Sequence, residues 1–230
     1  MISLQHVTKA YEHRGQRLVA FQVDQLSIPP GDYLAVVGPS GSGKTTFLSM
    51  LGGMLSPSEG SVWFEGQSLY ELRPAERTSI RRRRIGFVFQ TFNLVPYLTA
   101  LENVRMPLYL IGHKPAEQRE RALELLARVG LADRVDHKPS ELSTGQQQRV
   151  ALARTLANNP AVILADEPTG NLDPESREMV LAFLDEAHRE GRTIVTVTHD
   201  VAGAGRAARL LRLRDGNVES VSANQLKVAC

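Results

Sequence analysis

Short apolar runs recur along the chain and predict the strands of a sheet. Residues 33–37, 162–165 and 193–197 are continuous apolar or β-branched stretches, as expected of strands that are buried on both faces. Residues 62–64 and 85–89 instead alternate in character from one position to the next, which predicts strands with two different faces, as in an antiparallel sheet. The pattern therefore indicates both parallel and antiparallel strands.

Apolar residues recur at helical spacing in the middle of the chain, where they predict a helical lobe over about residues 91–158. Residues 175–187 form a further amphipathic stretch between two buried runs, which predicts a strand–helix–strand unit with parallel strands. The expected fold class is therefore α/β, in one domain over residues 1–230 with a parallel sheet core, an antiparallel β subdomain and the inserted α-helical lobe. The periodic positions of the lobe are Leu101, Val104, Ala122, Leu125, Leu126 and Val129.

The amino-acid composition agrees with the expected α/β domain and indicates the cellular compartment. The chain has 230 residues, of which 42% are hydrophobic and 23% charged, as in a soluble globular domain. No apolar stretch approaches the ~20 residues that cross a bilayer, and the first residues lack the apolar middle of a secretion signal. The one cysteine, Cys230, excludes a disulfide within the chain. We therefore expect a cytosolic protein.

The net charge of +2 provides no general attraction for nucleic acid. The local exception is the run Arg81 to Arg84, which could grip a phosphate backbone or an anionic membrane. Runs of charge are more often exposed faces, and no aromatic residue alternates with these arginines. We expect a solvated stretch and no nucleic-acid partner.

The strongest chemical signal follows the buried run at residues 33–37. Residues 38–46 read GPSGSGKTT and match the pattern G-x-x-x-x-G-K-[ST] between a predicted strand and a predicted helix. Such a turn points backbone N–H groups and the positive end of the helix into one concavity, which suits the β- and γ-phosphates of a nucleotide. Lys44 adds a full charge, and Thr45 offers a hydroxyl to Mg²⁺. The expected phosphate-binding residues are Gly38, Pro39, Ser40, Gly41, Ser42, Gly43, Lys44, Thr45 and Thr46.

A second buried run, residues 161–165, ends in Asp166 and Glu167. In open parallel sheets ligands bind beyond the carboxyl ends of the strands, so both carboxylates should face Lys44 and Thr45. Asp166 is expected to hold Mg²⁺, and Glu167 to take a proton from a water that attacks the γ-phosphate. The alternative is a capping pair at a helix start.

Two further segments, SELSTGQQQRV at residues 140–150 and TVTHD at residues 196–200, complete a set that resembles the ATP-binding-cassette (ABC) ATPases. The phosphate loop, Gln90, the LSTGQ segment, Asp166 with Glu167, Asp173 and His199 follow one another in the family's order over essentially the whole chain. The resemblance implies a P-loop NTPase of RecA-like core that binds ATP and Mg²⁺ and hydrolyses ATP.

The LSTGQ segment looks like the family's signature, LSGGQ, and departs from it at Thr144. In the family this segment receives the γ-phosphate of a nucleotide bound to the other subunit, so one chain does not complete its own site. Thr144 adds a β-carbon where the backbone approaches closely. The alternative is a simple helix N-cap. The resemblance assigns the contact to Ser143, Gly145 and Gln146.

The resemblance gives roles to residues that the sequence alone would not single out. Gln90 becomes the Q-loop residue, which contacts Mg²⁺ and the attacking water, and His199 becomes a hydrogen-bond donor to the γ-phosphate. Asp173 becomes a residue that crosses the dimer interface, and Tyr11 the aromatic on which adenine stacks, with a core aromatic as the alternative for Tyr11. The implied catalytic residues are Glu167, His199 and Gln90, and the implied Mg²⁺ ligands are Thr45, Gln90 and Asp166.

The segments VGPSGSGKTTFLSMLGGMLSPSEG, TALENVRMPL and DEPTGNLDP look most like the lipoprotein-release and macrolide-efflux branch of the family, the LolD and MacB type. This branch implies a second nucleotide-binding subunit, a homodimer by preference, and separate membrane permease chains at the inner face of the cell membrane. Residues 91–97 could form a groove for a short helix of that permease, or pack inside the lobe. An importer ATPase, a cell-division ATPase, a soluble ABC ATPase acting on nucleic acid and a non-catalytic ATP-binding module are the alternatives.

Overall fold

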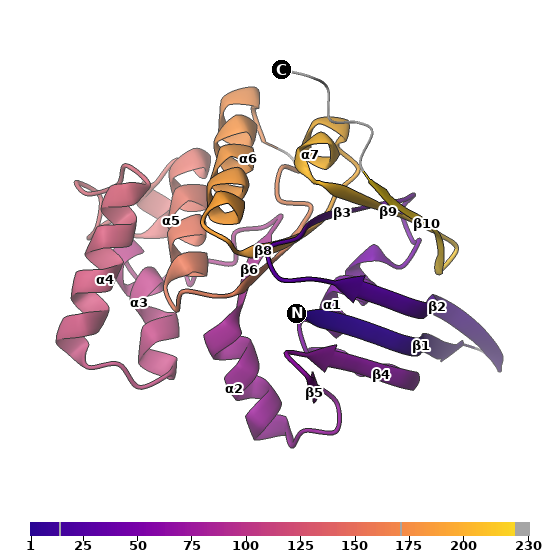
Figure 1. The fold of residues 1–230 in the computed structure, drawn as a ribbon. Helices are drawn as coiled ribbons and strands as arrows, with labels where there is room; N and C mark the ends of the chain where they lie inside the picture. The colour runs from indigo at the N-terminus through magenta and orange to yellow at the C-terminus, as the bar shows by residue number, and fades with distance from the viewer. Residues whose placement is uncertain (14, 171, 224–230) are drawn as a thin grey trace.

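A computed structural model describes residues 1–13, 15–170 and 172–223. Cys230 and Asn171 therefore lie outside the described residues. The strands form one ten-stranded mixed sheet in the order β5-β4-β1-β2-β10-β9-β3-β8-β7-β6 (Figure 1). The α/β class with a parallel core and an antiparallel part is confirmed.

The parallel half of the sheet is built on the apolar runs. It contains β9 (Arg209–Arg214), β3 (Tyr33–Val37), β8 (Thr193–Val197), β7 (Val162–Asp166) and β6 (Ile85–Phe89). Neighbouring side chains of β3 point to opposite faces, so Leu34 and Val36 join one apolar cluster while Tyr33 and Ala35 join the other. The continuous runs are therefore strands with a buried core on both faces.

The antiparallel half comes from the first 68 residues together with a strand near the C-terminus. It contains β1 (Ile2–His13), β2 (Gln16–Ile28), β4 (Glu59–Phe64) and β5 (Gln67–Ser68), and β10 (Asn217–Ala223) joins it to β9. Only a short parallel pairing, Asn217 with Gln22, connects β10 to β2. Helix α1 (Lys44–Leu51) packs against β2 of this half and against β7 and β8 of the parallel half, and its Phe47 stacks on Phe21 with ring centroids 5.1 Å apart.

The prediction that residues 85–89 belong to an antiparallel strand is wrong. β6 pairs in parallel with β7, from Ile85 opposite Val162 to Phe89 opposite Asp166. β6 is the last strand of the sheet, so it has a neighbour on one side only. Phe87 and Phe89 remain partly exposed while Val88 is buried, and this edge position produces the alternation that antiparallel strands show.

Helices cover both faces of the sheet. The helices of the middle segment are α3 (Ala100–Leu110), α4 (Pro115–Arg128), the 3₁₀ turn η1 (Pro139–Glu141) and α5 (Thr144–Leu156), and α3, α4 and α5 stand together at the left of Figure 1. α6 (Pro174–Arg189) lies between them and α7 (Val201–Arg206). None of the described helices is long and apolar enough to cross a membrane.

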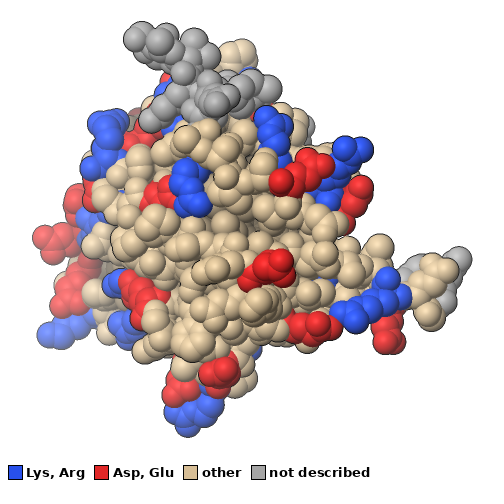
Figure 2. Space-filling view, turned by 45° about the vertical axis from the view of Figure 1, so that its right-hand side comes forward, with Lys and Arg blue, Asp and Glu red and all other residues tan. Residues whose placement is uncertain are grey.

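The arginine run closes helix α2 (Pro74–Arg84), which the hydrophobic pattern did not predict. Arg82, Arg83 and Arg84 are exposed, as expected of a solvated stretch. Two of them donate hydrogen bonds to the end of the α3 segment, Arg82 to the carbonyl of Leu110 at 3.5 Å and Arg83 to the carbonyl of Ile111 at 3.3 Å. On the face seen in Figure 2, acidic and basic side chains are interspersed, without a patch of one sign.

Candidate functional site

The loop of residues 38–46 joins β3 to α1 and has a conformation that depends on its glycines. Gly43 has a φ of 98°, in the left-handed region, and directly precedes α1. A Cβ at Gly43 would lie 2.1 Å from the carbonyl oxygen of Ala20, and one at Gly38 would lie 2.2 Å from that of Leu213. The loop is therefore held between β2 and β9 at a distance that only glycine allows.

Lys44 lies across this loop. Its Nζ donates hydrogen bonds of 2.8 Å to the carbonyl oxygens of both Gly38 and Pro39. The first turn of α1 holds no acidic residue, so the lysine charge and the positive helix end act in the same place. This arrangement favours an anion with several oxygens, as a polyphosphate has.

Asp166 ends β7 beside the start of α1. Thr45 Oγ1 and Asp166 Oδ1 are 3.5 Å apart. Burial raises the pKa of Asp166, the neighbouring Glu167 charge adds to the rise, and the hydrogen bond from Thr45 opposes it. A cation at this point would relieve the cost of the buried carboxylate.

Mg²⁺ fits this donor set. The described residues contain no cluster of three or more His, Cys, Asp or Glu side chains that could hold a metal. Mg²⁺ needs no such cluster, because it is usually held by one or two protein oxygens together with substrate phosphates and water. The Thr45 hydroxyl and the Asp166 carboxylate provide those oxygens at the mouth of the phosphate loop.

Glu167 follows in a turn of left-handed backbone, with a φ of 46°. Its amide donates to the carbonyl of Val197 on β8 at 2.9 Å, so the turn is fixed to the sheet. The side chain reaches His199: Glu167 Oε2 accepts a hydrogen bond from the His199 amide at 3.3 Å and lies 2.9 Å from His199 Nδ1. The carboxylate is mostly buried while the imidazole is 73% exposed, so the imidazole can meet a ligand at the surface.

Gln90 lies beside the same turn. It follows β6 and is exposed, and its amide nitrogen is so near Gly170 that a Cβ there would come within 2.6 Å of it. The structure thus brings Lys44, Thr45, Asp166, Glu167, His199 and Gln90 to the carboxyl ends of β3, β7, β8 and β6, as the sequence predicts.

The remaining predicted contacts lie elsewhere in the chain. Ser143 caps α5 in a reciprocal pair with Gln146: Ser143 Oγ accepts from the Gln146 amide at 3.3 Å, and Gln146 Oε1 accepts from the Ser143 amide at 2.9 Å. Asp173 caps α6 by accepting from the Ser176 amide at 2.9 Å, and hydrogen bonding from the Ser176 side chain and then from its amide lowers the pKa of Asp173. Thr144 is exposed at the first position of α5.

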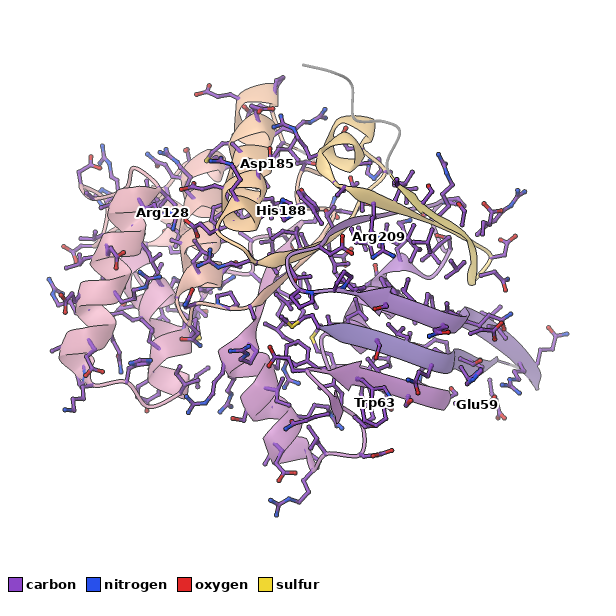
Figure 3. All side chains as sticks on the ribbon, in the orientation of Figure 1. Glu59, Trp63, Arg128, Asp185, His188 and Arg209 are labelled. Carbon is purple, nitrogen blue, oxygen red and sulfur yellow. The ribbon has the colours of Figure 1, made fainter. Side chains whose placement is uncertain are left out.

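Close packing joins these two helix starts. A Cβ at Gly145 would lie 3.1 Å from Ser176 Oγ, so the glycine lets α5 approach α6. Ser143, Gly145 and Asp173 line one cleft of about 800 Å³. Arg128 of α4, which is labelled in Figure 3, borders this cleft. It is paired with Glu186 of α6 at 2.8 Å.

The phosphate loop borders a different cleft, of about 460 Å³, which is lined by Gly38, Pro39 and His199. The predicted residues therefore form two groups: one at the ends of the parallel strands and one at the starts of α5 and α6.

Tyr11 is not a core residue, so that alternative is wrong. Its side chain is 44% exposed on β1, and the Lys9 ammonium lies 5.0 Å from the ring centroid. Leu18, directly opposite on β2, is 61% exposed. An exposed aromatic on β1 is available for stacking.

Sequence reasoning missed two residues of α5. Arg154 donates hydrogen bonds of 2.6 Å to the carbonyl oxygens of Phe92 and Asn93, just after Gln90, and burial lowers its pKa. Gln148 is 2% exposed and donates to the carbonyl of Pro168, next to Glu167. Their signal was a pair of polar side chains on the buried side of a helix, where apolar residues are usual.

A glycine-rich loop between strand and helix, with a lysine above it and a hydroxyl beside a carboxylate, defines a P-loop nucleoside triphosphatase. The model of the family described as ABC transporter matches residues 21–170. The chain belongs to the ABC transporter family.

Relatives and solved structures agree with this assignment. The chain is 47% identical to a macrolide export ATP-binding/permease protein MacB of Syntrophobacter fumaroxidans, over 96% of this chain and 32% of that protein. It is also 47% identical to an uncharacterized ABC transporter ATP-binding protein of Methanocaldococcus jannaschii, over 95% of both chains. This chain thus spans about a third of the MacB relative.

The dimeric structure of the ATP-binding cassette MJ0796 in a post-hydrolysis state, bound to ADP and phosphate, superposes with a TM-score of 0.89. It is 44% identical in sequence, and the match covers 97% of this chain and 98% of that one. The predictions of a P-loop NTPase fold and of an ATP-hydrolysing ABC cassette are confirmed, and the MacB relatives agree with the predicted branch.

Proposed function

We propose that this chain is the ATP-hydrolysing subunit of a MacB-type membrane machine, and that two copies close on two Mg²⁺·ATP. The observation that carries the proposal is the division of the site residues between two clefts. A chain that binds phosphate at one place and offers Ser143 and Gly145 at another completes a site only with a second chain.

In this proposal the phosphate loop and Lys44 hold the β- and γ-phosphates. Thr45 and Asp166, with Gln90 nearby, hold Mg²⁺, which neutralises charge on the phosphate oxygens when it is bound. Glu167 takes a proton from a water whose oxygen bonds to the γ-phosphorus, while the bond from that phosphorus to the bridging oxygen of ADP breaks. His199 keeps the Glu167 carboxylate in place through the contacts at 3.3 and 2.9 Å.

Chemistry at the starts of α5 and α6 supports the proposed dimer. Ser143, Gly145 and Gln146 offer a hydroxyl and the N–H groups of a helix start to the γ-phosphate of the partner's nucleotide. Asp173 is exposed beside them and would cross between the subunits. The relative MJ0796 has been solved as a dimer, which supports a homodimer here.

A membrane permease is the proposed recipient of the motion, at the inner face of the cell membrane. A cleft of about 400 Å³ lies between β6 and the helices α3 and α5, and its apolar lining suits a short helix of a partner. Tyr97 is 83% exposed in the segment after Gln90. The lining includes Phe87, Phe89, Val95, Met106 and Leu110.

Concentration dependence tests the proposed dimer. We expect Mg²⁺-dependent phosphate release per chain to rise with protein concentration until the dimer is saturated, and EDTA to abolish it. Activity per chain that stays constant to far below micromolar concentration, with a monomeric mass, would reject the shared site. Co-expression with a candidate permease should bring the chain to membranes, and Leu110→Glu should release it.

An importer ATPase or a cell-division ATPase would use the same chemistry with another membrane partner, and the identity of the permease separates these alternatives.

A further inference from the structure

The turn of residues 167–170 carries Glu167 and is held from several sides. Its two ends are joined by a hydrogen bond of 3.0 Å from the Gly170 amide to the Glu167 carbonyl. Thr169 is buried and its hydroxyl lies 3.4 Å from Asp200 Oδ2, beyond His199. Gln90 rests against Gly170. Any group that moves this turn therefore moves the general base.

Gln148 connects this turn to α5. Its Nε2 donates to the carbonyl oxygen of Pro168 at 3.2 Å, and its side chain is 2% exposed. Its Oε1 is buried and has no hydrogen-bond partner among the described residues. A buried side-chain amide that is only half satisfied costs free energy. Packing alone therefore does not explain a glutamine at position 148.

Helix α5 makes this bond a link between the two groups of site residues. Ser143 caps the helix, and Gln148 follows five positions later, about 7.5 Å along the axis. Val150, Leu152 and Ala153 bury the next turns of the helix, so it moves as a rigid rod. A displacement of Ser143 is thus passed to Pro168 and the turn.

We propose that Gln148 is a positioning residue that links the signature segment of a chain to the Glu167 of that same chain. Ser143 contacts the nucleotide of the partner's phosphate loop, whereas Glu167 acts on the chain's own nucleotide. Through Gln148, occupation of one site sets the position of the base at the other. This inference rests on the proposed dimer.

The neighbouring Gln147 provides a matched control. It is the same residue type on the same helix, and its Nε2 donates to the carbonyl oxygens of Pro139 at 2.9 Å and Leu142 at 3.1 Å. Among the described residues it makes no hydrogen bond to the 167–170 turn, and its two bonds instead stabilise the start of α5. A purely structural role for the buried amide would give both glutamines similar effects.

The test compares Gln148→Met with Gln147→Met, since methionine keeps the approximate volume and removes the donor. For Gln148→Met we expect kcat to fall about 3- to 10-fold, the effect of one lost hydrogen bond, with an unchanged Kd for ATP. The Hill coefficient for ATP should fall toward 1. Gln147→Met should keep both kcat and the Hill coefficient.

Equal kcat and Hill coefficients in wild type and Gln148→Met, or equal losses in both variants, would overturn the proposal. A wild type that hydrolyses ATP as a monomer would instead reject the proposed function on which it rests.

If Gln148→Met does not fold, hydrogen exchange on the folded wild type tests the same link. Hydrogen exchange at the amides of the 167–170 turn should slow by several-fold on adding Mg²⁺·ATP, and Ser143→Ala should remove most of that slowing. Full protection in Ser143→Ala would contradict the link.

Discussion

The two groups of site residues are built on different supports. Lys44, Asp166 and Glu167 lie at the ends of strands whose interior residues are fully buried, whereas Ser143 and Asp173 are exposed caps at the starts of helices. In the proposed function the first group binds a nucleotide within one chain, while the second receives its ligand from another chain. The first group is therefore fixed by the buried sheet, whereas the second consists of capping groups at exposed helix starts.

Substitutions in the two groups of site residues should therefore have different effects. Changes in the first group should remove chemistry or nucleotide binding within one chain. Changes in the second should leave the monomer's binding intact and weaken assembly. The five predictions below test this difference, from the largest expected effect to the smallest.

Glu167→Gln should have the largest effect. The amide keeps the size of the side chain but takes no proton from water, so hydrolysis should fall about 10²- to 10⁴-fold, the usual contribution of a general base. ATP binding should persist. Phosphate release and calorimetry measure the two effects, and near-normal turnover would remove Glu167 from its role.

Lys44→Ala should weaken nucleotide binding. The variant loses charge-assisted hydrogen bonds worth about 1.5–3 kcal/mol, so Kd for ATP should rise about 10- to 150-fold. Lys44 also bridges the carbonyl oxygens of Gly38 and Pro39. Lys44→Arg keeps the positive charge but changes the shape of the side chain, so it separates the effect of charge from the effect of side-chain fit on Kd. An unchanged Kd in calorimetry would contradict the phosphate-binding assignment.

Ser143→Ala should weaken the ATP-driven dimer about tenfold while Kd for ATP in the monomer stays the same. Thr99→Ala is the matched control, because Thr99 and Glu102 form the same reciprocal cap at the start of α3. Both variants should lose about 1 kcal/mol of stability to unfolding. Equal dimer affinity in the two variants would mean that Ser143 is only a helix cap.

Tyr11→Ala should raise Kd for ATP by about 2- to 12-fold, as expected from the loss of an aromatic stack worth about 0.5–1.5 kcal/mol. Affinity for inorganic tripolyphosphate should not change, because that ligand has no base. A parallel loss for both ligands would place the effect of Tyr11 in the phosphate loop instead.

Asp166→Asn should have the smallest effect on the nucleotide-free protein, and in the stabilising direction. Burial raises the pKa of Asp166, so the folded chain binds this proton more tightly than the unfolded chain does. Stability from this group therefore falls as pH rises through the raised pKa, and removing the charge should raise Tm at neutral pH by at most about 2–4 °C. The gain in Tm should vanish at acidic pH. A lower Tm of Asp166→Asn at neutral pH would contradict the inference that burying the Asp166 carboxylate costs free energy.

The sequence predicted the parallel core and the residues at its strand ends, because continuous apolar runs and a glycine-rich loop are local signals. It did not predict β1 and β2, since register shifts near His6 and between Lys9 and Ala10 break the period of two. It misassigned β6 because partial exposure at a sheet edge imitates an antiparallel strand.

The sequence did not predict those residues whose role depends on tertiary contacts. Gln148 and Arg154 act through carbonyl groups of distant segments, and no local pattern identifies such partners. The roles of Gln90 and His199 came from resemblance alone. Their shared position beside the 167–170 turn follows from the strand order, which the sequence did not fix.

The mass of Glu167→Gln in solution, by light scattering with and without Mg²⁺·ATP, tests the central claim most directly. The account predicts the 25.4 kDa monomer without nucleotide and twice that mass with Mg²⁺·ATP. It also predicts that adding Ser143→Ala to this variant raises the protein concentration needed for the dimer about tenfold although ATP stays bound. A variant that binds ATP and remains a monomer, alone and with its permease, would contradict the account.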